Sequence, residues 1–227
     1  MTRPPPPAPD KAPPAAPRAR RRDKELQARR RDLLAAARKL LRKGGAQAVT
    51  MRTVADLVGV STTVVYALFP DKAALIAQAV DDDLKRFSRH LQQALAQASD
   101  ARDALRQVAR AYAAFGVAHP QAYRLMFMEA RPASPVEDSS IEFGNPSEDA
   151  YALARTLADG LLREAGGPPP AQADIDTTAQ LVWEALHGVT SLRITLGDDP
   201  WFARLPLEQH IDRMVDIFAA GVQGRSR

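Results

Sequence analysis

The stretch GGAQAVTMRTVADLVGVSTTVVYALFPDKAAL, residues 44–75, decides the fold of this chain. Thr50 is a suitable N-cap for a short helix that ends before Gly59, where the backbone can turn sharply because glycine tolerates positive φ. Ser61 is a suitable N-cap for a second short helix. Two short helices around a tight turn, followed by the start of a third helix, are typical of a helix-turn-helix that reads DNA.

The second short helix has a buried face and an outward face. Val65 and Phe69 are four residues apart, which places them on one buried face together with Val60. The helix is too short to fold except as part of such a motif, so its outward side chains are predicted to face solvent or a DNA groove. These outward side chains, three hydroxyls and one aromatic ring, are Ser61, Thr62, Thr63 and Tyr66.

In order and spacing, these motifs resemble the N-terminal domain of the TetR (tetracycline repressor) family of bacterial transcription regulators. The resemblance covers about a quarter of the chain closely and includes Gly44-Gly45, the run from Thr50 to Ala55, the turn Gly59-Val60-Ser61 and the run from Val65 to Lys72. It implies an all-α fold with an N-terminal three-helix head. By this resemblance, residues 23–72 form a helix-turn-helix DNA-binding domain, and residues 73–227 form a helical effector-binding and dimerisation domain.

The resemblance also implies which residues bind double-stranded operator DNA: Thr50, Arg52, Thr53, Ser61, Thr62, Thr63, Val64, Tyr66 and Lys72. The first three would begin the helix that crosses the phosphate backbone, the next four would lie on the recognition helix, and the last two would hold phosphates. Helix N-termini suit this role because they offer free N–H groups and partial positive charge. Val64 at an outward position favours contact with thymine methyl groups.

Charge is unevenly distributed along the 227 residues. Residues 1–22 and residues 23–72 each carry a net charge of +5, whereas residues 73–227 carry −6. A basic N-terminal third suits a DNA-binding domain attached to a domain that does not bind DNA.

Residues 1–22 contain eight prolines and almost no bulky apolar side chain, so they are expected to form a disordered, partly polyproline-like tail. Two interpretations of the tail remain open. It either reaches phosphates or a narrow minor groove, or it is a solubilising leader without specific contacts. The basic cluster at its end is Arg18, Arg20, Arg21 and Arg22.

Composition narrows the class of protein. Cysteine is absent, which excludes disulfides, thiol catalysis and Cys-based zinc sites and is compatible with a reducing cytoplasm. No run of about 18 apolar residues occurs, so the chain is expected to be cytoplasmic with no membrane partner. Beyond the head, helical periodicity predicts a first helix over 23–43, a fourth from 71 to 98, and further helices over 100–118, 120–129, 146–165, 172–196 and 206–223.

Two motifs in the C-terminal domain, residues 119–127 and 181–189, resemble one TetR-like subgroup in which Trp, His and Gly cluster on the penultimate helix. In the family the last two helices form a four-helix bundle with a second subunit, which implies a homodimer through residues 175–196 and 207–222. A monomer interior would show the same periodicity. The apolar residues that recur there are Val182, Leu186, Val189, Ile211, Met214, Val215 and Phe218.

The family further implies a small-molecule effector in the C-terminal domain. The candidate side chains are mostly aromatic or Met with few polar groups, which suits a largely apolar or aromatic effector, although core residues show the same spacing. They are Tyr112, Phe115, Tyr123, Met126, Phe127, Trp183 and His187.

An enzyme is disfavoured. Glu184 and His187 form one Glu-x-x-His pair, but a helical di-iron site needs a second pair and two more glutamates. Asp81, Asp82 and Asp83 are adjacent on a helix and point in different directions, so a solvated face is expected rather than a magnesium site. We therefore predict no catalytic residues, no metal and no cofactor.

The sequence thus predicts an all-α, homodimeric, ligand-responsive repressor that binds a palindromic operator. The alternatives are an activator or protein-responsive regulator of the same fold, and a helical binding protein or enzyme whose head does not read DNA.

Overall fold

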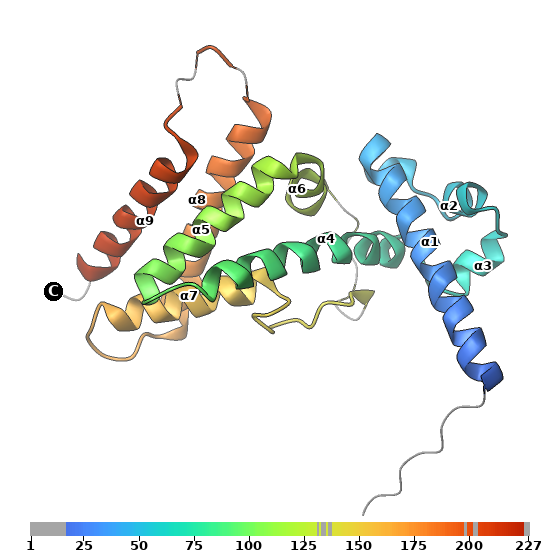
Figure 1. The fold of residues 1–227 in the computed structure, drawn as a ribbon, viewed down its shortest axis with the longest axis horizontal. Helices are drawn as coiled ribbons and strands as arrows, with labels where there is room; N and C mark the ends of the chain where they lie inside the picture. The colour runs from blue at the N-terminus through green and yellow to red at the C-terminus, as the bar shows by residue number, and fades with distance from the viewer. Residues whose placement is uncertain are drawn as a thin grey trace, which may run out of the picture.

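The computed structural model describes residues 17–130, 132, 135, 138–197, 199–201 and 204–224. These residues form nine helices and no strand, which confirms the all-α prediction (Figure 1). None of these helices is both long and apolar enough to cross a membrane. The helices are α1 (Pro17–Ala48), α2 (Met51–Val58), α3 (Thr62–Tyr66), α4 (Lys72–Leu95), α5 (Ala101–Ala118), α6 (Pro120–Phe127), α7 (Ala150–Glu164), α8 (Gln172–Thr195) and α9 (Leu207–Gly224).

The head consists of α1, α2, α3 and the start of α4, and it lies at one end of the molecule (Figure 1). Its core is formed by side chains at helical spacing on α1 that meet the buried faces of α2 and α3. Leu33, Leu41, Val54, Val65 and Phe69 are each 0–1% exposed. Burial of these five side chains holds the short helices α2 and α3, which could not persist alone.

Helix α1 begins at Pro17, six residues earlier than expected, so residues 17–22 are not part of a disordered tail. Proline is tolerated at the first helical position, and arginine is a good helix former. Arg21 also pairs with Glu25 one turn later, at 3.0 Å. Residues 1–16, the rest of the expected tail, lie outside the described residues, as does the side chain of Arg18.

The expected end of the first helix near residue 43 corresponds to a break in α1. Gly44 (φ −154°, ψ 25°) and Gly45 (φ 62°, ψ −166°) leave the helical conformation, and one further turn follows up to Ala48. The positive φ of Gly45 explains why glycine stands there.

The body consists of the remaining helices, with α5 at its centre. Helix α5 packs against α4, α7, α8 and α9, and small residues such as Ala109 and Ala113, both 0% exposed, allow that close packing. Helix α4 runs from the head along the length of α5, so a single helix joins the two parts (Figure 1).

The acidic run on α4 does not form the solvated face that the sequence suggested. Asp81 and Asp83 are only 3% and 5% exposed, and only Asp82 faces solvent. Asp81 accepts a hydrogen bond from the Ser139 hydroxyl at 3.0 Å, and Asp83 pairs with Arg86 at 2.7 Å. The expectation was wrong for Asp81 because a segment nearly 60 residues away folds over α4 and supplies its partners, which helical periodicity does not show.

Candidate functional site

The first turn of α2 is closed by two threonines, as the sequence predicted for Thr50. The Thr53 N–H donates to Thr50 Oγ1 at 2.9 Å, and the Thr50 N–H donates to Thr53 Oγ1, also at 2.9 Å. Both residues remain exposed. This capping box fixes the N-terminus of α2 at the surface, with Arg52 exposed beside it.

Helix α3 presents short polar side chains to solvent. Val65 is fully buried, Val64 is partly buried, and Ser61, Thr62 and Thr63 are exposed. Ser61 occupies the N-cap position of α3, but its hydroxyl does not accept a capping hydrogen bond, contrary to expectation. These exposed hydroxyls therefore remain available to another molecule.

The turn between α3 and α4 carries the two candidates for phosphate contacts. Tyr66 is 56% exposed although it is aromatic, and Lys72 is the first residue of α4. Asp71 caps α4 by accepting from the Ala74 N–H at 2.9 Å. The sequence-predicted DNA-binding residues thus lie on α2, on α3 and at the start of α4, and they are exposed or partly exposed.

Arg30 on α1 positions this turn and was not singled out from the sequence. Its guanidinium donates to the Leu68 carbonyl at 3.1 Å and lies 4.8 Å from the centre of the Phe69 ring. Arg30 precedes Leu33 by three residues and so continues the apolar stripe of α1, which is the signal that could have identified it.

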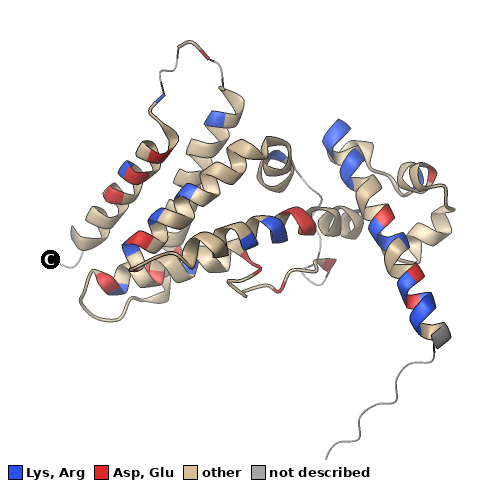
Figure 2. Ribbon diagram, in the orientation of Figure 1, with Lys and Arg blue, Asp and Glu red and all other residues tan. Residues whose placement is uncertain are grey.

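Positive charge is concentrated on the head. Figure 2 shows Lys and Arg at several places along the ribbon of α1. Helix α9, in contrast, carries the acidic residues Glu208, Asp212 and Asp216. An exposed basic helix beside α2 and α3 would attract the phosphate backbone of DNA. The exposed basic residues of α1 are Arg20, Arg21, Arg22, Lys24, Arg29, Arg31, Lys39, Arg42 and Lys43.

In the body, four predicted effector residues form one hydrogen-bonded chain. The Trp183 indole N–H lies 3.2 Å from the Tyr112 hydroxyl, which lies 2.9 Å from the Tyr123 hydroxyl. The Tyr123 hydroxyl lies 2.8 Å from Nδ1 of His187. An indole N–H can only donate, so the chain is satisfied when each hydroxyl donates onward and Nδ1 of a neutral His187 accepts.

Burial keeps the side chains of this hydrogen-bonded network uncharged at neutral pH. Desolvation raises the pKa of Tyr112 to about 12 and also raises the pKa of Tyr123. Desolvation lowers the pKa of His187 below its ordinary value of 6.5. The polar groups of this hydrogen-bonded network therefore offer hydrogen bonds but no formal charge.

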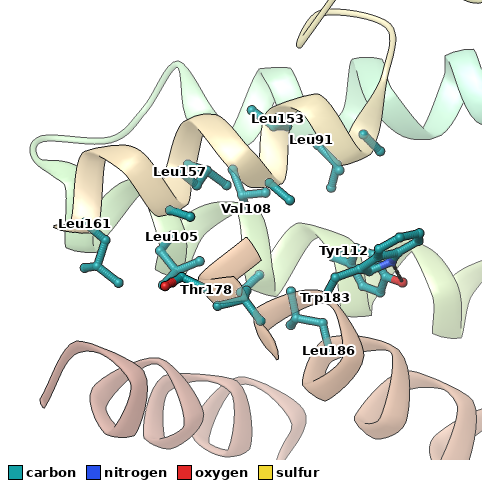
Figure 3. Close-up of a pocket in the computed structure, with 15 residues that line it drawn as sticks. Leu91, Leu105, Val108, Tyr112, Leu153, Leu157, Leu161, Thr178, Trp183 and Leu186 are labelled. Atoms are coloured by element: carbon teal, nitrogen blue, oxygen red, sulfur yellow. Dashed lines mark hydrogen bonds between the residues drawn. The ribbon is translucent and has the colours of Figure 1, made fainter. Parts of the chain in front are cut away.

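A narrow apolar cavity lies beside these hydrogen-bonded side chains, between α4, α5, α7 and α8 (Figure 3). Its polar side-chain groups are limited to Tyr112, Trp183 and Thr178. The apolar side chains that Figure 3 labels around it are Leu91, Leu105, Val108, Leu153, Leu157, Leu161 and Leu186.

A larger groove shares Trp183 with this cavity. The groove and the cavity leave about 1210 and 550 Å³ of unoccupied space, both volumes including open solvent. The other groove residues are Leu84, Met126, Phe127, Tyr151, Gln180, Glu184 and His187.

The predicted effector residues do not all line one space, although Trp183 lines both the groove and the cavity. Met126, Phe127 and His187 line the groove, and Tyr112 lines the cavity. Tyr123 is fully buried behind them.

Phe115 faces elsewhere, with its ring 5.2 Å from Phe87 and 4.7 Å from His119. The sequence did not point to Tyr151 or to the leucines of α7, because aliphatic residues at helical spacing resemble any core.

The apolar residues that the sequence assigned to a dimer interface lie largely inside the chain. Val182, Leu186, Ile211 and Val215 are 0–6% exposed, because α8 and α9 both pack on α5. That assignment was wrong for these four residues. The large exposed apolar side chains of the same helices are Leu181, Trp183, Leu192 and Ile217, and Leu196 at the C-cap of α8 is also exposed.

Two family models match the chain. The model described as "Bacterial regulatory proteins, tetR family" matches residues 33–79, and "Tetracyclin repressor-like, C-terminal domain" matches residues 105–219, just over half of the chain. No curated protein gives a significant match. The Trp-His-Gly subgroup stays a prediction.

Several solved structures share the fold. A protein of unknown function from Rhodococcus sp. RHA1 is 24% identical with a TM-score of 0.63, covering 85% of this chain and 94% of its own. A TetR family transcription regulator from Marinobacter aquaeolei VT8 is 16% identical with a TM-score of 0.60, covering 88% and 97%. A tetR family regulatory protein from Rhodococcus RHA1 is 18% identical with a TM-score of 0.55, covering 85% and 96%. With both its head and its body matched, the chain belongs to the TetR family of bacterial transcription regulators.

Proposed function

We propose that this regulator is a ligand-responsive repressor that binds a palindromic operator as a homodimer. The observation that carries the proposal is the continuity of α4. Lys72 begins this helix in the head, Leu84 lines the groove, and Leu91 lines the cavity. Any ligand that displaces the pocket end of α4 therefore acts on the head through one rigid element. A DNA-binding regulator functions where the chromosome lies, so we infer a cytoplasmic location.

The proposed DNA surface combines backbone and base contacts. Exposed side chains at the start of α2 and the start of α4, together with Tyr66, are assigned to phosphates, which position the protein without reading sequence. Thr62, Thr63 and Val64 on α3 are assigned to base edges, where their methyl groups would favour thymine. The phosphate-contacting residues are Thr50, Arg52, Thr53, Tyr66 and Lys72, with Ser61 at the start of α3.

The proposed effector is a largely apolar or aromatic small molecule. Support comes from the lining of the cavity, where polar groups are few and two of them, Tyr112 and Trp183, hydrogen-bond to each other. Binding would favour an arrangement of α4 that fits DNA poorly, and the operator would be released.

The proposed homodimer uses the exposed side of α8 and α9. Leu181 and Leu192 are about half exposed, at 51% and 47%, and Ile217 is 66% exposed. Leu192→Arg together with Ile217→Arg should convert the dimer to a monomer in analytical ultracentrifugation. The matched control is Leu26→Arg on α1, where an equally exposed leucine (48%) lies far from this surface. Unchanged sedimentation of the double variant would argue against this interface.

Selection of bound sequences from a random DNA pool tests the regulator directly. The wild-type chain should enrich a palindrome, and Tyr66→Ala and Lys72→Ala should each lose the enrichment. Arg163→Ala, an exposed arginine on α7, should retain it and controls for loss of charge. If only salt-sensitive, sequence-independent binding is found, the operator-binding proposal fails.

A further inference from the structure

We propose that the cavity and the groove together bind a cationic amphiphile, with a slim apolar chain in the cavity and an ammonium-type head in the groove beside Glu184. This inference rests on the proposed function only in taking this pocket as the effector site. It specifies the charge and shape of the ligand, which the proposed function leaves open.

The cavity selects for an apolar chain. Its walls are aliphatic along most of its length, from Leu161 at one end to Tyr112 and Trp183 at the other (Figure 3). The polar groups at the aromatic end already hydrogen-bond to one another. A polar group placed in the cavity would lose its water without gaining a partner, which is costly. Because the cavity is narrow, it suits an extended chain rather than fused rings.

Trp183 lines both the cavity and the groove, so a ligand that occupies both spaces would lie along its side chain. Trp183 is 36% exposed. The Tyr151 ring lies 5.4 Å away and the Phe127 ring 6.3 Å away, measured between ring centres. These three rings form an aromatic mouth whose faces attract a cation.

The charges around the mouth favour a cation over an anion. Glu184 is exposed on the groove, and no Lys or Arg lines it among the described residues. His187 also lines the groove, and burial lowers its pKa, so it is neutral at pH 7. A ligand with a carboxylate head group would therefore meet the carboxylate of Glu184 in the groove, with no Lys or Arg among the described residues lining the groove to compensate.

Two basic residues that are close in sequence to groove-lining residues pair with other carboxylates. Lys85, next to the groove residue Leu84, lies 3.9 Å from Glu148. Arg155 on α7 pairs with Asp176 on α8 at 2.7 Å. None of the ion pairs between the described residues involves Glu184, so its carboxylate is open to a ligand in the groove.

Three ligands share a twelve-carbon chain and differ only in the head group, so together they isolate the effect of its charge. They are dodecyltrimethylammonium, dodecanol and dodecanoate, each used below its micelle concentration. Binding to the full chain is measured by quenching of Trp183 fluorescence in a Trp201→Phe background. Trp201 is 95% exposed in the segment between α8 and α9, so its replacement leaves one tryptophan, which reports on the pocket. We expect the ammonium to bind about tenfold or more tightly than dodecanoate.

Two substitutions separate the contribution of the ligand's charged head group from that of its alkyl chain. Glu184→Gln should reduce the preference for ammonium over dodecanoate to about threefold or less while leaving dodecanol binding unchanged. Glu208→Gln, at an exposed glutamate on α9, is the matched control. It should change neither the preference for ammonium nor the binding of dodecanol. Leu157→Phe should weaken all three ligands by a similar factor, because it fills the cavity. If Leu157→Phe fails to fold, Ala154→Leu tests the same wall.

Equal or tighter binding of dodecanoate, or an ammonium preference that survives Glu184→Gln, would overturn the inference. Release of labelled operator DNA, followed by fluorescence anisotropy, is measured in parallel. Release by dodecanol or dodecanoate alone would preserve the proposed repressor and overturn the cationic ligand. Tight ammonium binding without release would support the site assigned here and overturn the ligand-responsive part of the proposed function.

Discussion

Arg110 on α5 and Asp212 on α9 face each other as a two-point pair, with Nε 2.8 Å from Oδ1 and Nη2 next to Oδ2. Both side chains are about one-third exposed, at 34% and 33%. One turn away, Arg102 and Arg106 both hydrogen-bond Asp216, at 2.7 and 3.1 Å. A row of charged pairs therefore fixes the orientation of α9 on α5, in addition to the apolar contacts beneath it.

Breaking the first of these pairs should loosen α9. Arg110→Ala or Asp212→Ala should each lower the free energy of unfolding by about 1 kcal/mol, since a two-point pair exceeds an ordinary surface ion pair. Denaturant titration at low and high salt measures the change, which should shrink as salt rises. Arg163→Ala, which breaks an exposed pair with Asp159 within α7, is the control and should cost clearly less. Additive effects in the double variant would show that the two side chains do not interact.

Gly116→Ala should be strongly destabilising. A Cβ at Gly116 would lie 2.3 Å from Cγ2 of Thr190 and 2.9 Å from Cδ2 of Tyr123, where α5 meets α6 and α8. Overpacking of this kind costs about 1–3 kcal/mol, although alanine favours a helix. Thermal melting should show a lower Tm than for Gly221→Ala, since a Cβ at Gly221 meets nothing within 4 Å. Equal Tm values for the two variants would mean that α6 and α8 move apart freely.

Thr50→Ala and Thr62→Ala should separate folding from DNA contact. Thr50→Ala removes one half of the capping box and should lower the free energy of unfolding by about 1 kcal/mol as well as weakening operator binding. Thr62→Ala, at an exposed position on α3, should weaken operator binding with little change in stability. Denaturant titration and DNA anisotropy on the same samples measure both quantities. Unchanged operator affinity in Thr62→Ala would remove this residue from the DNA surface.

Mild acid should destabilise the body through His187. Its folded-state pKa is lowered from 6.5 by burial, so the unfolded chain takes up a proton at a higher pH than the folded chain. The free energy of unfolding therefore falls as pH drops below about 6.5, and the whole contribution is gone below the folded-state pKa. The loss of Tm between about pH 7.5 and pH 5.5 should be larger for the wild type than for His187→Gln. Identical losses would mean that His187 titrates normally.

Much of the fold was predictable because its signals are local. Asp71 and Asp100 each cap a helix through a backbone N–H three residues later, at 2.9 and 2.7 Å, and the helices begin within a residue or so of their predicted starts. The helix-turn-helix was equally visible, since Thr50 and Gly59 act on their own neighbours.

Contacts between distant segments could not be predicted in this way. Asp81 is buried because Ser139, 58 residues away, folds over it. Leu181 and Val182 are adjacent and both apolar, yet only Val182 packs on α5. Helix α8 is apolar on several sides, so periodicity alone could not identify its inner face. That Trp183 lines both the cavity and the groove depends on several helices meeting, which no single stretch of sequence reveals.

The continuity of α4 has a geometric consequence for control of DNA binding. Its 24 residues span about 36 Å, so a tilt of about 5° at the pocket end displaces the head by about 3 Å. In the proposed dimer, opposite tilts would change the distance between recognition helices by about 6 Å, against a half-site spacing of about 34 Å that DNA holds fixed. In the proposed dimer, a tilt of only a few degrees in α4 would therefore be enough to take two heads out of register with the double helix.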